Sequence, residues 1–411
     1  MLSLRRFIAA LGLTLALVAC ATKTPDAPSR AAPLTILISI DAFRADYLDR
    51  GVTPTLAGLA AGGVRGDMRP SFPSKTFPNH YTLVTGLRPD RHGVVDNNMI
   101  DPAIPGVIFS ASNKAAVVDA RWWNGAEPIW VSAERQGVRT GSMFWPGSEA
   151  PIQGVRPSQW AAYDESKPAN VRVDEALSWL DLPANQRPGF ITLYFDAVDT
   201  AGHHFGPDSA EVNAAAAQTD AAIARLVAGL KARGRAANLV IVADHGMAPT
   251  PADHVIYADD LVPLAHTRTL TMGAFWTLYP VAGDEAEIDR ALIRPLPHMQ
   301  CWRKSQIPVR YHYGRHPRVP PYFCLAETGW EISTHAYRAR HANPDRGDHG
   351  FDPFAPAMRA VFVANGPAFR RGVRLKTFDN VDVYPLVAQV AGLKPEPNDG
   401  RLADVAAALA P

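Results

Sequence analysis

An excess of charge of one sign is absent from this chain. Its 411 residues include 41 Lys and Arg against 40 Asp and Glu, so the formal net charge at pH 7 is +1. A balance this even argues against a broad basic face that binds polymeric nucleic acid. Disorder is excluded as the main state, because 47% of the residues are hydrophobic and 20% are charged. The length allows one elaborate catalytic domain or two to three simple ones, and we expect a small ligand.

A run of apolar residues long enough to span a membrane is also missing near the N-terminus. The stretch Phe7–Ala19 has thirteen residues, whereas a spanning helix needs about twenty. Two arginines precede it, so residues 1–19 are predicted to be a signal peptide. Cys20 follows the stretch, and the sequence Leu17-Val-Ala-Cys20 resembles a bacterial lipobox. The next residue is Ala21 and not the Asp that usually signals inner-membrane retention. We expect a periplasmic protein of the bacterial envelope, anchored to the outer membrane through a lipid on Cys20; an ordinary secretory signal is the alternative.

Cysteine is scarce, with three in the whole chain. Cys301 and Cys324 are the two that follow Cys20. Either kind of signal peptide leads to an oxidising compartment, so we expect these two residues to form a disulfide. Two free thiols and a metal-binding pair are the alternatives.

Four nearly continuous apolar runs predict buried strands, and they alternate with helical patterns. The runs cover residues 34–40, 189–195, 238–243 and 359–364. The clearest helical pattern covers residues 209–233, with Asp208 and Glu211 as its capping box and Gly234 as its stop. The alternation predicts an α/β fold, in which a mainly parallel central sheet carries helices on both faces.

The domain boundaries follow from composition. Residues 20–33 are rich in Thr, Pro, Ser and Ala and are predicted to be a linker. A single catalytic domain is expected from residue 34 to residue 400. Within it, residues 262–345 show weak periodicity, and their many Pro, His and Arg residues predict a loop-rich insertion.

Acidic and histidine side chains follow the first three predicted strands. Asp41 comes directly after the first, Asp199 and His203 follow the second, and Asp244 and His245 follow the third. Open α/β sheets bind ligands at this edge, although a single Asp after a strand is more often a helix N-cap. Carboxylate and imidazole groups are ligands that zinc accepts, and they suit a hydrolytic site. His349, ahead of the fourth strand, is a further candidate ligand that spacing alone does not decide.

A possible nucleophile lies in the segment 71–86. Pro78 suits the first turn of a helix, so the hydroxyl of Thr76 would lie where free backbone N–H groups attract an anion. A threonine hydroxyl is a poor nucleophile until a metal or a base removes its proton. The alternative is that Thr76 or Ser74 is simply an N-cap.

Together these segments resemble the nucleotide pyrophosphatase/phosphodiesterase family of the alkaline phosphatase superfamily. The resemblance covers about residues 35–250 and 345–390. Its landmarks, in chain order, are Ser39-Ile-Asp41-Ala-Phe-Arg44, Lys75-Thr76-Phe-Pro-Asn-His80, Thr85-Gly-Leu-Arg-Pro-Asp-Arg-His-Gly93, Asp96-Asn97-Asn-Met99, Phe144-Trp-Pro-Gly147, Asp199-Thr-Ala-Gly-His203, Ala243-Asp-His-Gly-Met247 and His349-Gly-Phe-Asp352.

The resemblance implies a role for each matched residue. Thr76 would be the nucleophile, and Asn97 would help its backbone N–H to bind a phosphoryl oxygen. Two zinc ions are implied: Asp41, Thr76, Asp244 and His245 would hold one, and Asp199, His203 and His349 the other. The substrate-binding residues would be Lys75 and Asn97 at the phosphate and Phe77, Trp145 and Tyr163 in an aromatic pocket for the base.

The implied function is metal-dependent hydrolysis of nucleotides such as ATP, dinucleotides and nucleotide sugars, which releases nucleoside 5′-monophosphate through a covalent threonine intermediate. A phosphomonoesterase or a phosphodiesterase of choline lipids could use the same two-zinc site. A sulfatase is disfavoured, because residues 74–78 lack the arginine that its motif requires. A metal-binding protein without turnover is the alternative from another class. The sequence departs from the family pattern at Pro353 and throughout residues 262–345, whose role the resemblance does not explain.

Overall fold

The computed structural model describes residues 33–341 and 343–411. The predicted signal peptide, Cys20 and nearly all of the predicted linker lie outside these residues. Within the described part of the chain, no helix is both long and apolar enough to cross a membrane.

A nine-stranded sheet forms the centre of the fold. In spatial order its strands are β18 (Val373–Arg374), β2 (Val64–Arg69), β17 (Ala360–Asn365), β8 (Ala237–Val242), β1 (Leu34–Ile40), β7 (Phe190–Phe195), β5 (Thr140–Met143) and β6 (Gln159–Trp160), with β19 (Phe378–Asp379) also pairing with β2. β1 is parallel to both neighbours, so that Leu37 lies opposite Thr192 of β7 and Val240 of β8. β17 is antiparallel to β8 and β2. The four predicted strands are confirmed, each to within one residue at either end.

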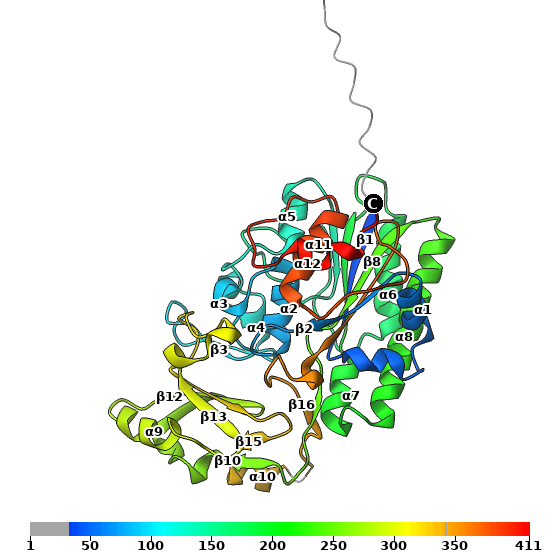
Figure 1. The fold of residues 1–411 in the computed structure, drawn as a ribbon. Helices are drawn as coiled ribbons and strands as arrows, with labels where there is room; N and C mark the ends of the chain where they lie inside the picture. The colour runs from blue at the N-terminus through cyan, green and yellow to red at the C-terminus, as the bar shows by residue number, and fades with distance from the viewer. Residues whose placement is uncertain (1–32, 342) are drawn as a thin grey trace, which may run out of the picture. The chain divides into compact units, whose positions relative to one another are not determined.

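Helices cover both faces of this sheet, as predicted (Figure 1). One face carries α1 (Pro54–Ala61), α6 (Ala169–Ser178), α7 (Ala197–Phe205) and α8 (Ala210–Ala232), and the other carries α2 (Thr76–Thr85), α5 (Ile129–Arg135) and α11 (Val383–Val390). The short helices α3 (Pro89–His92) and α4 (Lys114–Val117) and the hairpin of β3 (Met99–Ile100) and β4 (Ile108–Phe109) lie in the connections.

The long helix α8 confirms the predicted helix but not its predicted cap. The side chain of Ser209, not that of Asp208, accepts the N–H of Val212 at 3.2 Å. Asp208 is used elsewhere, because its carboxylate pairs with Arg50 at 2.7 Å. Gly234 follows the helix with a φ of +60°, which supports its predicted role as the stop.

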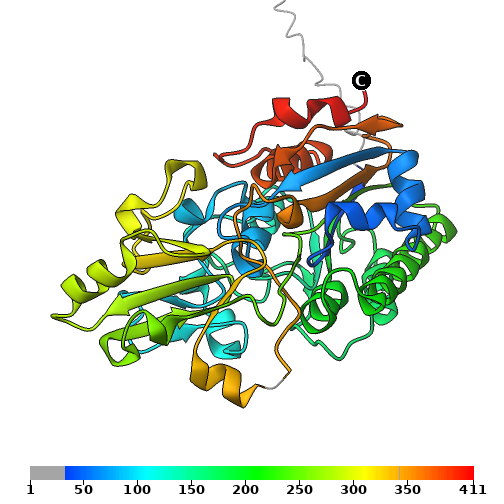
Figure 2. The same cartoon turned by 60° about the horizontal axis from the view of Figure 1, so that its bottom comes forward.

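The predicted loop-rich insertion contains an ordered sheet, whose short strands are joined by long connections. A four-stranded antiparallel sheet runs in the order β11 (Thr267–Thr271), β12 (Phe275–Pro280), β14 (Tyr322–Ala326) and β13 (Met299–Arg303). The insertion also contains α9 (Glu285–Leu292), α10 (His335–Arg340) and β15 (Glu331–Ser333), which pairs in parallel with β10 (Val255–Tyr257), a strand that precedes the insertion. Both views place it beside the main sheet (Figures 1 and 2).

Two features stabilise the insertion. Trp276, Leu278, Ile288 and Leu292 are fully buried in a hydrophobic core that is separate from the main one. A disulfide joins Cys301 to Cys324 across β13 and β14, which confirms the predicted pairing. The periodicity of such short strands, separated by proline-rich connections, is too brief to be recognised in the sequence.

The domain also extends beyond the predicted end at residue 400. Helix α12 (Leu402–Val405) packs near α11, and the side chains of Val405 and Ala408 are fully buried. The backbone N–H of Arg370 donates to the carbonyl of Ala408 at 2.9 Å. The last residues therefore belong to the folded unit.

Candidate active site

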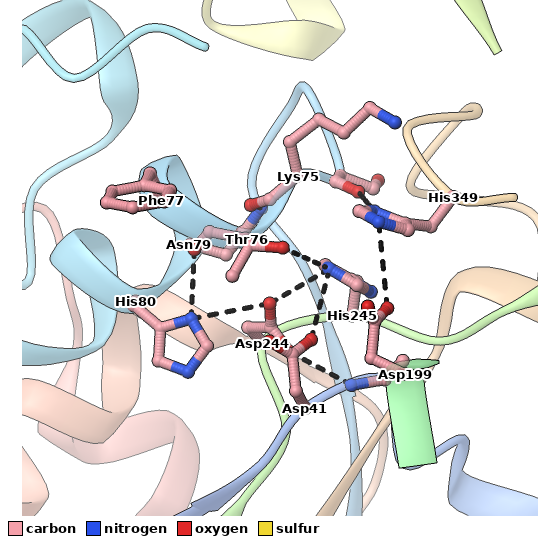
Figure 3. A network of polar contacts seen from close by, with 12 residues as sticks. Asp41, Lys75, Thr76, Phe77, Asn79, His80, Asp199, Asp244, His245 and His349 are labelled. Atoms are coloured by element: carbon pink, nitrogen blue, oxygen red, sulfur yellow. Dashed lines mark hydrogen bonds and ion pairs between the residues drawn. The ribbon is translucent and has the colours of Figure 1, made fainter. Parts of the chain in front are cut away.

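The acidic and histidine residues predicted at the strand ends meet at one edge of the central sheet (Figure 3). Asp41 follows β1, and Asp244 and His245 follow β8. Asp199 and His203 lie on α7, which begins just after β7. β1 lies between β7 and β8 and is parallel to both. The residues that follow these three strands therefore lie at the same edge of the sheet.

One set of ligand atoms gathers around His245. Its Nε2 lies 2.9 Å from Asp244 Oδ2, 3.6 Å from Asp41 Oδ1 and 3.3 Å from the hydroxyl of Thr76. Ligands at about 2.0–2.2 Å from a tetrahedral ion lie about 3.3–3.6 Å from one another. The separations of His245 from Asp41 and Thr76 fall in this range. The ligand atom of His245 also lies within 4.8 Å of those of Asp199 and His349, so His245 adjoins both candidate sets of ligands.

A second set gathers around Asp199. Its two carboxylate oxygens lie 3.5 Å from His203 Nε2 and 3.7 Å from His349 Nε2. The ring of His349 stacks on that of His245, with centroids 3.6 Å apart, so the two sets are adjacent. His349, which spacing did not decide, therefore lies among the other predicted ligands. Asp348 also lies close enough to His203 and His349 to belong to a candidate group.

Hydrogen bonds fix the same tautomer in three of these histidines. The Nδ1 atoms of His203, His245 and His349 each lie 2.9 Å from a backbone carbonyl oxygen. The acceptors are the carbonyls of Gly347, Gly246 and Ser74, in that order. A carbonyl can only accept, so Nδ1 carries the hydrogen and Nε2 presents its lone pair to the site. Burial and the neighbouring His245 and Lys75 hold the pKa of His349 well below its ordinary value, which favours the neutral ligand form.

Three carboxylate oxygens in the site are buried and have no hydrogen-bond partner among the described residues. They are Oδ1 of Asp41, Oδ1 of Asp199 and Oδ2 of Asp244. Burial raises the pKa of Asp41 well above its ordinary value, and the nearby Asp244 and Asp199 add to the rise. Buried charge without a partner is costly, and a bound cation removes that cost. The donor set of carboxylate oxygens and imidazole nitrogens therefore fits divalent metal ions.

Thr76 is the first residue of α2. The N-cap is Lys75, and its side chain makes no capping bond, so Thr76 is not the cap. Ser74 is not the cap either, because its hydroxyl donates to the carbonyl of Phe351 at 3.0 Å. The hydroxyl of Thr76 is thus free to face the metal ligands at the positive end of the helix.

Asn97 lies beside the start of the same helix. Its Oδ1 accepts the backbone N–H of Phe77 at 2.9 Å. The amide nitrogen Nδ2 of Asn97 is then available as a hydrogen-bond donor. Among the described residues it has no acceptor. The backbone N–H of Thr76 and the amide of Asn97 are therefore suitably placed to bind an anionic oxygen.

A cavity of about 330 Å³ opens from this point, and its lining includes Thr76, Phe77, Asn97, Trp145 and Tyr163. The predicted catalytic pair and the predicted aromatic residues therefore share one cavity. The indole N–H of Trp145 donates to the carbonyl of His80 at 3.1 Å, which fixes this wall against α2.

Lys75 is the predicted substrate-binding residue that the structure does not place in this cavity. Its ammonium lies 3.2 Å from Asp348 Oδ1, and both side chains are largely buried. Figure 3 shows the side chain extending away from Phe77 and His80. The carboxylate of Asp348 neutralises its charge, so the expected phosphate contact is not supported.

Two supporting residues were missed by the sequence analysis. The hydroxyl of Tyr194 donates to Asp41 Oδ2 at 2.6 Å, which orients that carboxylate. His80 Nδ1 lies 2.9 Å from the carbonyl oxygen of Thr76 and 3.4 Å from Asp244 Oδ2. His80 could have been inferred, because it follows Thr76 by four residues and shares its face of the helix. Tyr194 resembles any apolar strand residue in the sequence and gives no such signal.

The insertion contacts the site through two buried carboxylates. Asp348 Oδ2 accepts the backbone N–H of Ala274 at 2.9 Å, and Asp96 Oδ2 accepts the hydroxyl of Thr271 at 2.6 Å. Burial raises the pKa of Asp96 to about 6, although the hydrogen bond from Thr271 opposes the rise. Asp96 directly precedes Asn97, so the insertion holds a loop of the site.

Comparison with known proteins decides the family. The family model for type I phosphodiesterase / nucleotide pyrophosphatase matches residues 35–352, which is more than half of the chain. The chain belongs to this family. It is accordingly an enzyme of the nucleotide pyrophosphatase/phosphodiesterase class, and the resemblance inferred from the motifs is confirmed.

Individual relatives extend this result. A pyrophosphatase/phosphodiesterase of Schizosaccharomyces pombe is 38% identical and covers 89% of this chain and 78% of its own. Mouse ectonucleotide pyrophosphatase/phosphodiesterase family member 1 is 35% identical over 92% of this chain, which spans only 43% of that protein. Human ectonucleotide pyrophosphatase/phosphodiesterase 5 has a similar structure, with a TM-score of 0.86 at 30% identity over 91% of this chain and 99% of its own. The alkaline-phosphatase-like α/β fold is thereby confirmed.

We predict that zinc raises the melting temperature of chelator-stripped protein. An ion that binds only the folded state adds about 4 kcal/mol of stability at a thousand times its Kd. Thermal unfolding of wild type and His349→Ala, with and without zinc, measures the effect, and the variant should show a smaller rise.

His266→Ala is the matched control for this measurement. His266 lies in a separate, partly exposed group with Asp284 and Glu287 that could also bind a cation. Its loss should leave the zinc effect intact. A zinc effect that disappears in His266→Ala and persists in His349→Ala would place the metal on the insertion instead.

Proposed function

We propose that this enzyme uses two zinc ions to hydrolyse phosphodiester and pyrophosphate bonds in nucleotides, with release of nucleoside 5′-monophosphate. The observation that carries the proposal is the position of Thr76. Its hydroxyl lies 3.3 Å from His245 Nε2, at the start of α2 and at the wall of the cavity. Relatives support the substrate class: one is named a bis(5′-adenosyl)-triphosphatase, and murine member 5 has a structure in complex with AMP.

Seven side chains would hold the metal ions. Asp41, Thr76, Asp244 and His245 would bind one ion, and Asp199, His203 and His349 would bind the other. When bound, two divalent ions supply charge neutralisation at the phosphoryl group and lower the pKa of a coordinated hydroxyl. The unpartnered carboxylate oxygens and the shared histidine tautomer support this assignment.

The residues of the chain then carry out two displacements. The oxygen of Thr76 attacks phosphorus, and the bond from phosphorus to the leaving oxygen breaks. The backbone N–H of Thr76 and the amide of Asn97 hold a phosphoryl oxygen during this step. The intermediate is a nucleotidyl-threonine, in which phosphorus bridges Thr76 and the nucleoside as a phosphodiester. Water next attacks this phosphorus and the bond from phosphorus to the Thr76 oxygen breaks, which releases the nucleoside monophosphate and restores the hydroxyl. Two inversions give net retention at phosphorus.

A structure of murine member 5 carries a threonine-to-alanine change and is described as inactive, which supports a nucleophilic threonine.

Phe77 and Tyr163 would hold the base between them. Both line the cavity that begins at Thr76. Stacking of a base on an aromatic side chain contributes about 1–3 kcal/mol and tolerates any base. We therefore propose loose base identity in the nucleotide substrate.

Thr76→Ala should abolish turnover while the protein keeps its fold and its metal, because the other ligands remain. Thr76→Ser should retain part of the activity, since a hydroxyl is still present. Steady-state kinetics with ATP, together with elemental analysis for two zinc per chain, checks both statements. A rate close to that of wild type in Thr76→Ala would disprove the covalent mechanism.

Tyr163→Ala should lower kcat/KM for ATP by about tenfold or more, as loss of a stacked ring predicts. A small aryl phosphodiester has no base to stack and should be affected much less. Equal losses on the two substrates would remove the base-binding role.

A screen of ATP, a dinucleotide, a nucleotide sugar and glycerophosphocholine would show the substrate class, and preferred cleavage of the last would indicate a choline-lipid phosphodiesterase.

We further propose that the mature protein is a periplasmic lipoprotein of the bacterial outer membrane, anchored through Cys20. The lipobox-like sequence supports this location. Cys20→Ser should abolish acylation and release the protein from the membrane fraction. Mass spectrometry of the N-terminus checks this, and an unmodified wild-type protein would leave only secretion.

A further inference from the structure

A buried arginine lies behind the cavity. The side chain of Arg172, on α6, is only 3% exposed. Its guanidinium donates to the carbonyl of Tyr194 at 3.1 Å and to a carboxylate oxygen of Asp196 at 2.9 Å, and its Nε donates to the carbonyl of Lys167 at 2.8 Å. The charge of Arg172 is thus both paired and hydrogen-bonded, which a buried charge requires.

Asp196 connects this arginine to the cavity wall. Its second carboxylate oxygen accepts the hydroxyl of Tyr163 at 2.5 Å. Burial raises the pKa of Tyr163, and the bond to Asp196 adds to the rise, so the hydroxyl stays protonated as a donor. Asp196 therefore accepts Arg172 on one oxygen and Tyr163 on the other.

The backbone N–H of Tyr163 donates to Glu149 Oε1 at 3.0 Å, and the side chain needs separate support because the segment around it is irregular. The residues between Trp160 and Ala169 form no helix or strand, and most of them are exposed. The ring of Tyr163 packs edge-on against Phe144, with centroids 5.3 Å apart. A ring that is free to rotate would lose rotamer entropy when a base stacks on it, and a ring that is already fixed avoids that loss.

The same arginine also contacts the strand that orients a proposed metal ligand. Its guanidinium binds the carbonyl of Tyr194, whose hydroxyl donates to Asp41. Asp196 is also the N-cap residue of α7, which carries Asp199. The pair thus lies between the aromatic wall and the metal ligands.

We propose that the buried Arg172–Asp196 pair is a positioning device that fixes the ring of Tyr163 for stacking on the base of a nucleotide. This inference rests on the proposed function. Asp196 lines the same cavity as Tyr163, and we assign it a positioning role because Arg172 binds one of its carboxylate oxygens and Tyr163 binds the other. Preorganisation of the ring improves affinity for substrates that carry a base.

A double-mutant cycle on Asp196→Asn and Tyr163→Phe tests the proposal. Tyr163→Phe removes only the hydroxyl and keeps the ring and the Arg172–Asp196 pair. This variant therefore does not leave the buried charge of Arg172 without its carboxylate partner. Each single variant should raise KM for ATP by about threefold to tenfold, which is the size of effect that loss of one ordinary intramolecular hydrogen bond produces. The ratio of kcat/KM for ATP to that for bis(4-nitrophenyl) phosphate should fall.

The double variant decides whether the two residues act together. If Asp196 acts through the hydroxyl of Tyr163, the double variant should be no worse than the more affected single variant. A double variant whose loss is the product of the single losses would overturn the proposal. Asp174→Asn is the matched control, because Asp174 pairs with Arg225 on the exposed surface of α6 and α8, and it should leave the substrate ratio unchanged.

A readout without substrate separates this proposal from the proposed function. The protein labelled with 3-fluorotyrosine gives a ¹⁹F resonance for Tyr163, which Tyr163→Phe identifies by its absence. In Asp196→Asn this resonance should shift and change in width, and an unchanged resonance would overturn the positioning role. If wild type hydrolyses no nucleotide, the proposed function fails, and the ¹⁹F spectrum still decides whether Asp196 fixes the ring.

Discussion

The site depends on the repulsion among three carboxylates brought together at one edge of a sheet. Asp41, Asp199 and Asp244 each leave a buried oxygen without a hydrogen-bond donor among the described residues. A buried carboxylate that lacks donors is costly in its ionised form, and burial together with Asp244 and Asp199 raises the pKa of Asp41 for this reason. A bound cation would remove that cost. The histidines nearby supply lone pairs instead of N–H donors, which leaves a cation as the partner that satisfies all of these groups.

The order of the strands creates this convergence. The carboxyl ends of parallel strands lie at one edge of a sheet, and β1 lies between β7 and β8, to which it is parallel. The antiparallel strand β17 lies between β8 and β2, and the segment that leads into β17 carries His349 to the same site. Because helix α2 begins at Thr76 beside the same edge, the positive end of the helix and the metal ligands act on one point.

Most of the site could be predicted because its information is local. Asp41, Asp244 and His245 follow apolar runs, and Thr76 precedes a helix start marked by Pro78. The roles of Asn97, Phe77, Trp145 and Tyr163 came from the family resemblance. Long-range partners could not be predicted. The resemblance implied that Lys75 contacts the phosphate, yet Lys75 pairs with Asp348, which is 273 residues away in the sequence. Tyr194 and the cap of α8 were missed because several equivalent residues compete for each role, and only packing selects one.

The insertion shows why such long-range pairings matter to catalysis. Asp348 accepts hydrogen bonds from the insertion at Ala274 and from the backbone of His349, and it also binds Lys75 ahead of the nucleophile. Asp96 links Thr271 to the loop of Asn97 in the same way. Two carboxylates thus connect the inserted sheet, with its own core and disulfide, to the segments that carry Thr76, His349 and Asn97, the residues proposed as nucleophile, metal ligand and oxyanion donor. The insertion therefore acts as a support for three loops of the site, a role that its irregular sequence conceals because each contact is made by a single residue.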